Sequence, residues 1–479
     1  MITFTICLLL LVGGYFAYGY VIERIIRPTA APTPAVLHPD GVDYISLPGW
    51  KIFMIQFLNI AGLGPVFGAI MGAQFGTASF VWIVAGTLFA GATHDYLSGM
   101  LSLRSNGESL PDTVGRFLGL GTKRVMRVFT VVLLVLVGAV FVSGPAGLLA
   151  NMTPSHLDAT FWIVVIFAYY VLATLLPIDK VIGKIYPLFA VVLLFMAVGI
   201  LFMLYWRHPQ LPELTEGWGE NRTGLPIFPM MFVSIACGAI SGFHATQSPL
   251  MARCMTSERQ GRPVFYGATV AEGVVALIWA AAATCFFGEN GISYMQGGQE
   301  VLYTGADVAS GISNEWLGAF GGMLAILGII AAPVSTGDTA LRSARLMVAD
   351  MFKIEQRSMS KRLLVSVPLF LATMGILLFS LSDKEGFNII WRYFAWSNQT
   401  LSVFTLWALT VYLTRAKKPF WVAFIPALFM TAVCVSYICM APEGLGLSEP
   451  YAYGIGGACV AASAVWYMAW RKRSGMENR

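Results

Sequence analysis

The sequence predicts an all-α integral membrane protein of about thirteen transmembrane helices, ten of which form a five-plus-five inverted repeat. Three observations predict this fold. The 479 residues are 57% hydrophobic and 11% charged, with a mean hydropathy of +0.71, whereas soluble domains carry roughly 25% charged residues. Apolar windows of helix length follow one another along the chain. Two of them, five windows apart, are interrupted by glycine and proline.

Windows of roughly 20 apolar residues place the helices, which we number from zero. They lie near 2–22, 50–74, 78–102, 126–150, 159–177, 182–206, 228–252, 264–287, 316–350, 361–381, 391–413, 419–440 and 451–471. The first has neither a basic n-region nor an A-x-A site, so we expect a retained helix. The Gly-rich, acidic segment 288–315 is expected to be an external loop that can form a lid.

Four segments follow from these windows. We expect an extra helix and a cytoplasmic linker over 1–49, a first repeat over 50–206, a second repeat over 207–413, and two further helices with a basic tail over 414–479. The two repeats would each begin with an interrupted helix, and these two helices would cross the membrane in opposite directions.

The distribution of basic residues predicts the orientation. Most of the 30 Lys and Arg fall in the loops after even-numbered helices and in the C-terminal tail. The other side keeps Arg207, Arg222, Lys384 and Arg392. We therefore expect a multi-pass protein of the cell (inner) membrane, embedded in lipid, with the N-terminus outside and the C-terminus cytoplasmic. The net charge of +5 comes from these loops, so no nucleic-acid partner is expected, and the oligomeric state is not predicted.

The first interrupted helix reads QFLNIAGLGPVFGAIMGAQFG over 56–76. Pro65 lacks an N–H, and glycine removes side-chain restraint, so a helix broken here frees backbone groups that lipid cannot satisfy. Transporters use such breaks to hold solutes and ions; the alternative is a packing kink. The candidate solute contacts are Gln56, Asn59, Gly62 and Gly64, with interhelical hydrogen bonding as the other role for the amides.

The second interrupted helix reads FVSIACGAISGFHATQSPLMAR. Half-helices that begin after Gly64 and Gly242 would present their positive ends to a carboxylate-bearing solute. The candidate solute contacts here are Ser241, Gly242, His244 and Gln247, together with Asn398 of the helix near 391–413. For Gln247 and Asn398, interhelical hydrogen bonding is the alternative role.

A third polar motif, APVSTGDTALRSARL, lies in the helix near 316–350. A carboxylate deep in a membrane usually faces a pathway or a partner. Asp338 shares a helix face with Ser335, and oxygen clusters suit hard cations or a proton. The alternative is an ion pair of Asp338 with Arg342 or Arg345. The candidate coupling-ion residues are Asp338, Ser335, Thr336 and Thr339.

His94 and Asp95 of the helix near 78–102, with Glu272 of the helix near 264–287, are candidates for a proton relay, because histidine titrates near neutral pH. Adjacent residues point about 100° apart on a helix, so His94 and Asp95 are not expected to pair with each other. The alternative is structural packing. His94 and His244 alone are a weak metal signal, and we expect no metal and no cofactor.

No GxxxxGK[ST] motif is present, so an H⁺ or Na⁺ gradient would drive transport. No hydrolase or redox constellation stands out, and we expect no enzyme. The alternatives are a channel, a nutrient-sensing receptor or, less favoured, a membrane-embedded enzyme that uses His94, His244 and the carboxylates.

Four stretches in order, GLGPVFGAIMGAQFG, THDYLSGMLSLRSNGESLPD, SGFHATQSPLMARCM and APVSTGDTALRSARL, resemble the carbon starvation protein (CstA) family over residues 48–410. The resemblance implies an inner-membrane carrier that imports short peptides or pyruvate, by proton symport, in the response to carbon starvation. It also implies membership of the amino acid–polyamine–cation carriers, with a leucine-transporter-like fold. The family does not decide between peptide and pyruvate.

In that fold a coupling cation lies between the first broken helix and the eighth helix. The resemblance therefore implies a site made by backbone near Ile60–Leu63 and by the side chains of Ser335, Thr336 and Thr339. Asp338 would add a carboxylate to this site.

Overall fold

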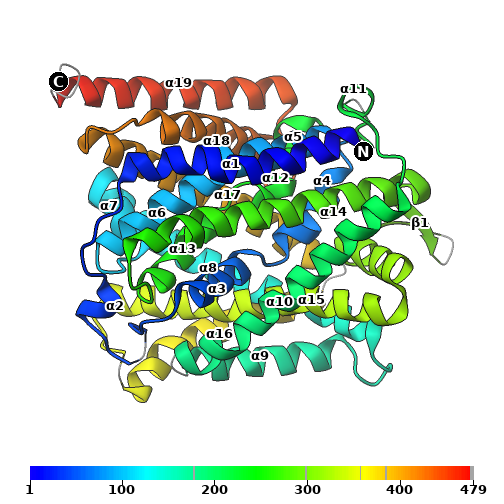
Figure 1. The fold of residues 1–479 in the computed structure, drawn as a ribbon, viewed down its shortest axis with the longest axis horizontal. Helices are drawn as coiled ribbons and strands as arrows, with labels where there is room; N and C mark the ends of the chain where they lie inside the picture. The colour runs from blue at the N-terminus through cyan, green and yellow to red at the C-terminus, as the bar shows by residue number, and fades with distance from the viewer. Residues whose placement is uncertain are drawn as a thin grey trace.

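The computed structural model describes residues 1–474 except 42, 176–177, 219, 297–298, 357 and 383–385. Its long helices lie side by side in one block, with α19 (Glu449–Arg473) along one edge and α9 (Ala159–Leu175) and α16 (Met359–Ser382) along the opposite edge (Figure 1). Lys384 and the last five residues of the predicted basic tail lie outside the described residues.

The other helices of the first half are α1 (Ile2–Ile26), α2 (Pro34–Leu37), α3 (Gly49–Ile60), α4 (Ala69–Ala73), α5 (Ala78–Ala85), α6 (Ala92–Arg104), α7 (Leu110–Leu118), α8 (Leu120–Met152) and α10 (Ile178–Arg207). Those of the second half are α11 (Leu214–Gly217), α12 (Ile227–Ile235), α13 (Gly242–Ala252), α14 (Ala268–Asn290), α15 (Gly305–Phe352), α17 (Gly386–Arg415) and α18 (Trp421–Met440). Short π-helical or 3₁₀ turns cover Gly64–Gly68, Gly86–Gly91, Ala236–Gly238, Glu258–Gln260 and Arg262–Gly267.

Each predicted window contains helix. Among the described residues, nine helices are long and apolar enough to cross a membrane, or ten if the bent pair Gly49–Ile60 and Gly64–Ala73 is one span. Burial sorts these spans into inner and outer ones: 83% of the apolar window of Glu258–Asn290 is buried, against 17% for α19. The protein is therefore a multi-pass helical membrane protein, while the count of thirteen spans and the limits of the two repeats stay predictions.

Both predicted interruptions are confirmed. The axes of Gly49–Ile60 and Gly64–Ala73 differ by 55°. Between α12 and α13, Ser241 has extended backbone, with φ −140° and ψ 122°. The chain runs from α3 to α4 in one direction and from α12 to α13 in the opposite direction (Figure 1). Accordingly, α3 packs against α13 and α4 against α12, which is the contact pattern of two antiparallel broken helices.

Two expectations about loops were wrong in part. The segment 288–315 contains an antiparallel hairpin, β1 (Ser293–Gln296) and β2 (Gln299–Leu302), and α15 begins already at Gly305. Thr304 and Asp307 form a capping box that starts α15. The linker before α3 packs into the protein: Thr33 Oγ1 donates to the Met255 carbonyl at 2.5 Å.

Candidate functional site

The two helix breaks touch each other because glycine leaves room. A Cβ added to Gly64 would lie 2.1 Å from the Cβ of Cys237, and one added to Gly68 would lie 2.9 Å from the carbonyl oxygen of Ser234. Carbon atoms in contact are ordinarily about 3.5–4.0 Å apart. The small residues of the first break therefore permit the close approach of the turn Ala236–Gly238.

Asn398 of α17 holds the second break in place. Its Oδ1 accepts hydrogen bonds from the Phe243 N–H at 2.7 Å and from Ser241 Oγ at 3.0 Å, and its Nδ2 donates to Cys237 Sγ at 3.2 Å. It thus caps the N-terminus of α13, where the first backbone N–H groups have no intrahelical partner. Asn398 was predicted as a solute contact, with interhelical hydrogen bonding as the alternative role; the structure shows such hydrogen bonds at both ends of its amide, and the solute contact stays a prediction. Gly242 packs directly against the backbone of α17. A Cβ added to Gly242 would lie 2.4 Å from the Ser402 nitrogen, so a larger residue would not fit here.

Three amide side chains beside the breaks are incompletely hydrogen-bonded. Gln56 and Asn59 of α3 are fully buried, and within the described part of the chain none of their four amide atoms meets a hydrogen-bond partner. The buried Gln247 of α13 donates to Thr246 at 2.9 Å, but its Oε1 meets no partner there. Burying an amide without hydrogen bonds costs roughly 1–3 kcal/mol. These side chains therefore fit a place where the protein binds a polar guest.

A buried cluster centred on Asp95 joins three elements. Asp95 Oδ1 lies 2.7 Å from His94 Nδ1, and Asp95 Oδ2 lies 2.7 Å from His244 Nδ1 and 2.5 Å from Thr269 Oγ1. His244 Nε2 is in turn 3.5 Å from Glu272 Oε2. The ionisable side chains of the cluster are 0–1% exposed. The structure thus brings His94, Asp95 and Glu272, predicted as a relay, together with His244, predicted as a solute contact.

The expectation that His94 and Asp95 do not pair was wrong. The angle of about 100° separates the Cα–Cβ bonds of adjacent helical residues, not the ends of their side chains. The imidazole is long enough to reach back to the neighbouring carboxylate. Because both side chains are buried, that hydrogen bond avoids the cost of an unpaired polar group.

The cluster has places for further protons. Each imidazole has its Nδ1 against the ionised carboxylate of Asp95, which can only accept, so each Nδ1 is assigned the proton. In this neutral tautomer each Nε2 is an acceptor. Neither Nε2 and neither oxygen of Glu272 has a hydrogen-bond partner among the described residues. With both carboxylates ionised and both imidazoles neutral, the cluster carries two negative charges, and two added protons neutralise it. No group of three or more His, Cys, Asp or Glu with metal-binding geometry occurs in the described residues.

The predicted coupling-ion residues of α15 face different neighbours. Thr336 Oγ1 donates to the Leu58 carbonyl of α3 at 3.0 Å and to the Ala332 carbonyl at 2.8 Å. Its partner on α3 is thus Leu58, two residues before the predicted Ile60–Leu63. The hydroxyls of Ser335 and Thr339 bond to carbonyls of α15 itself.

Asp338 lies about 200° around α15 from Thr336. Tyr186 of α10 donates to Asp338 Oδ2 at 2.5 Å and lies 3.1 Å from the Ser335 carbonyl. Asp338 and Thr336 were expected to belong to one oxygen cluster. The structure places them on different sides of α15 instead. Tyr186 was not predicted; its only signal in the sequence is a hydroxyl within an apolar helix.

The two arginines offered as partners of Asp338 approach another carboxylate. Arg342 Nη1 lies 3.4 Å and Arg345 Nη2 3.7 Å from Oδ1 of Asp43, which belongs to the segment before α3. All three side chains are buried. Asp43 had no signal in the sequence beyond a charge in a Pro-rich segment.

The family model described as "Carbon starvation protein CstA" matches residues 1–157, 149–287 and 280–437. A membrane protein of Haemophilus influenzae is 42% identical over 60% of this chain and 91% of its own length. The "Peptide transporter CstA" of Escherichia coli is 23% identical over 89% of this chain and 78% of its own. The "Pyruvate/proton symporter BtsT" of Escherichia coli is 27% identical over 55% of this chain and 46% of its own.

Solved structures show the same fold at low identity. A manganese transporter of Eremococcus coleocola matches with a TM-score of 0.56 and 12% identity over 91% of this chain and 99% of its own. The nucleobase-cation-symport transporter Mhp1 matches with a TM-score of 0.56 and 15% identity over 91% and 96% of the two chains. These neighbours have the leucine-transporter fold, which agrees with the two antiparallel broken helices.

Proposed function

Because this chain belongs to the carbon starvation protein CstA family, we propose that it is a proton-driven secondary transporter that imports short peptides or small carboxylates such as pyruvate. One observation supports this most directly. His244, in the half-helix that follows the second break, joins the buried carboxylates of Asp95 and Glu272. A change in the position of α13 would therefore change both the surroundings of the breaks and the partners of the ionisable groups.

The solute would bind beside the breaks, near Gln56 and Asn59. Their amides offer both donors and acceptors, which suits a peptide group or a carboxylate. Relatives named as a peptide transporter and a pyruvate/proton symporter support both solute classes. The proposed setting is the inner membrane of a cell short of carbon, with the N-terminus outside.

The charge of the cluster favours H⁺ over Na⁺ as the coupling ion. Two negative charges that are not balanced by positive charge within the cluster are costly in a membrane interior, by several kcal/mol for a fully uncompensated ion, so the closed cluster is expected to hold protons. Sodium would instead use the oxygens near Thr336, where the hydroxyl already donates to Leu58 and Ala332.

Uptake into reconstituted vesicles tests the proposal. Labelled dialanine, trialanine and pyruvate are supplied in sodium-free buffer with an acidic outside, and the wild type should accumulate at least one above equilibrium. Asp95→Asn should abolish accumulation while thermal unfolding in detergent still shows a folded protein. Asp338→Asn, run in parallel, shows whether the second carboxylate couples transport instead.

Other outcomes would overturn the proposal in distinct ways. Accumulation that requires sodium would refute the proton as coupling ion. Flux that never exceeds equilibrium would indicate a channel, and binding without flux a receptor. A chemically altered solute inside the vesicles would indicate an enzyme.

A further inference from the structure

A row of polar residues leads from the Asp95 cluster toward the end of α6. Asp95, Ser98 and Ser102 are spaced i, i+3 and i+7 and so share one face of the helix. Ser98 Oγ donates to the main-chain carbonyl of Asp95 at 3.2 Å, and Ser102 Oγ donates to the main-chain carbonyl of Glu108 at 2.9 Å. Both serines are buried, and α6 ends nearby at Arg104, on the Lys- and Arg-rich side.

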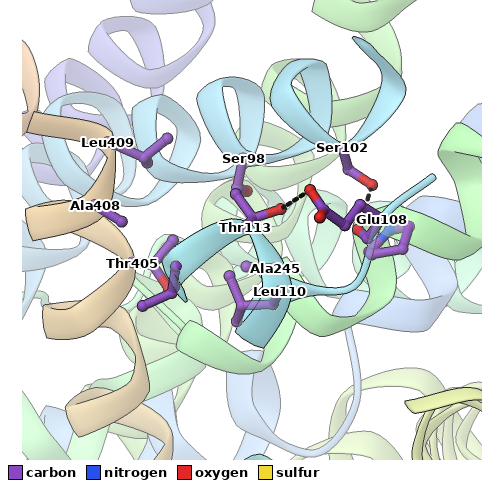
Figure 2. A pocket seen from close by; sticks show the side chains of 11 residues that line it. Ser98, Ser102, Glu108, Leu110, Thr113, Ala245, Thr405, Ala408 and Leu409 are labelled. Carbon is purple, nitrogen blue, oxygen red and sulfur yellow. Dashed lines mark hydrogen bonds between the residues drawn. The ribbon is translucent and has the colours of Figure 1, made fainter. Parts of the chain in front are cut away.

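This row opens into a small cavity between α6, α7, α13 and α17 (Figure 2). Its walls include Ser98, Ser102 and Glu108, and on α13 they include Ala245, the residue after His244. The free volume is about 10 Å³, which is close to the minimum for one water molecule, and the walls offer it polar partners.

Glu108 lies where the cavity meets the surface. Its carboxylate accepts hydrogen bonds from Thr113 Oγ1 at 3.5 Å and from Arg116 Nη2 at 2.5 Å, and its side chain is 25% exposed. Arg253 approaches the residue before Glu108: it donates to the Gly107 carbonyl and lies 3.7 Å from Asp350 of α15.

We propose that Glu108 receives the proton that leaves the Asp95 cluster and releases it to the Lys- and Arg-rich side. The proton would pass through the hydroxyls of Ser98 and Ser102 and one water molecule. Each hydroxyl accepts one proton and gives up its own, so no charge stays on a serine. The Glu108 carboxylate becomes a neutral acid and then loses the proton to bulk water. This inference rests on the proposed proton coupling, and it adds a proton exit that the helix breaks do not supply.

The test separates net transport from exchange. Vesicles with wild type or Glu108→Gln contain a pH-sensitive dye and receive dialanine or pyruvate under an inward proton gradient. Loss of a proton-transfer group should slow net uptake and internal acidification by about tenfold or more. Exchange of labelled for unlabelled probe at equal pH needs no net proton release and should fall far less. Glu108→Asp should restore most of the net rate.

Two further variants control for structure. Asp112→Asn breaks the ion pairs of α7 with Lys123 and Arg127, but Asp112 does not line the cavity, so net uptake should persist. Ser98→Ala/Ser102→Ala should slow net uptake without loss of folding. Acidification by Glu108→Gln at the wild-type rate would overturn the exit route, as would an equal loss of net uptake and exchange. A wild type that accumulates a probe without acidification would refute the proton coupling itself, and this route with it.

Discussion

The contact between the two helix breaks can be tested by adding a single methyl group. Gly64→Ala places a Cβ 2.1 Å from the Cβ and 2.8 Å from the Sγ of Cys237. Relief requires a shift of more than 1 Å in a packed interior, and overpacking of this kind costs about 1–3 kcal/mol. We expect the upper end of that range, because the atom it meets first is held close to the backbone. Transport should fall together with the free energy of unfolding.

A double-mutant cycle makes this prediction specific. Cys237→Gly removes both clashing side-chain atoms and leaves Cα at 3.3 Å, so the double variant should be at least about 1 kcal/mol more stable than additivity predicts. Denaturant unfolding in detergent measures each variant. Gly147→Ala in α8 is the control, since its Cβ would meet nothing within 4 Å. If the two costs simply add, the breaks are not in contact and the arrangement of the site is wrong.

Three other predictions follow from single contacts. Tyr186→Phe removes the hydroxyl bonded to Asp338 and should cost about 1–3 kcal/mol in unfolding free energy, whereas the exposed Tyr451→Phe should cost little. Asn398→Ala removes the cap of α13 and should cost about 1–2 kcal/mol; an Asn398→Ala variant as stable as the wild type would refute the cap. Hydrogen bonds from the Met1 amine and from Thr3 hold the pKa of Glu213 at about 2, below its ordinary 4.5. Since the folded value is the lower one, Glu213 stabilises the protein above pH 4.5 and this contribution is lost as the pH falls to about 2. Glu213→Gln should therefore lower the thermal midpoint at neutral pH, with a difference from wild type that closes on acidification.

The breaks could be predicted from sequence because their cause is local. Pro65 and the glycines around it interrupt a helix whatever packs beside them, and the opposite directions of the two broken helices follow from the number of spans between them. The same reasoning located buried ionisable residues, since a charge in an apolar window needs a partner.

Partners across helices could not be predicted in this way. Asp338 pairs with Tyr186, and Arg342 with Asp43, through contacts between segments far apart in sequence. The role of Asn398 depends on the backbone of another helix, so its residue type alone suited a solute contact equally well. The T-x-x-D capping box at Thr304 is different: it was visible in the sequence and would have placed the start of α15 correctly.

The position of His244 gives the proposed coupling a structural basis, because it would let a proton and a solute influence each other without touching. His244 is the third residue of α13. Asn398 accepts a hydrogen bond from the first turn of this helix, and Asp95 hydrogen-bonds to the imidazole ring of His244. Loss of one proton leaves the cluster with an uncompensated buried charge, at a cost of several kcal/mol. A shift from 1:99 to 99:1 between two conformations needs about 5.5 kcal/mol. The two energies are of the same size, so deprotonation alone can favour a conformation in which α13 moves and water reaches the cluster. Since the same movement would disturb the packing of Gly64 against Cys237, the half-helix that carries the proposed proton site would also shape the proposed solute site.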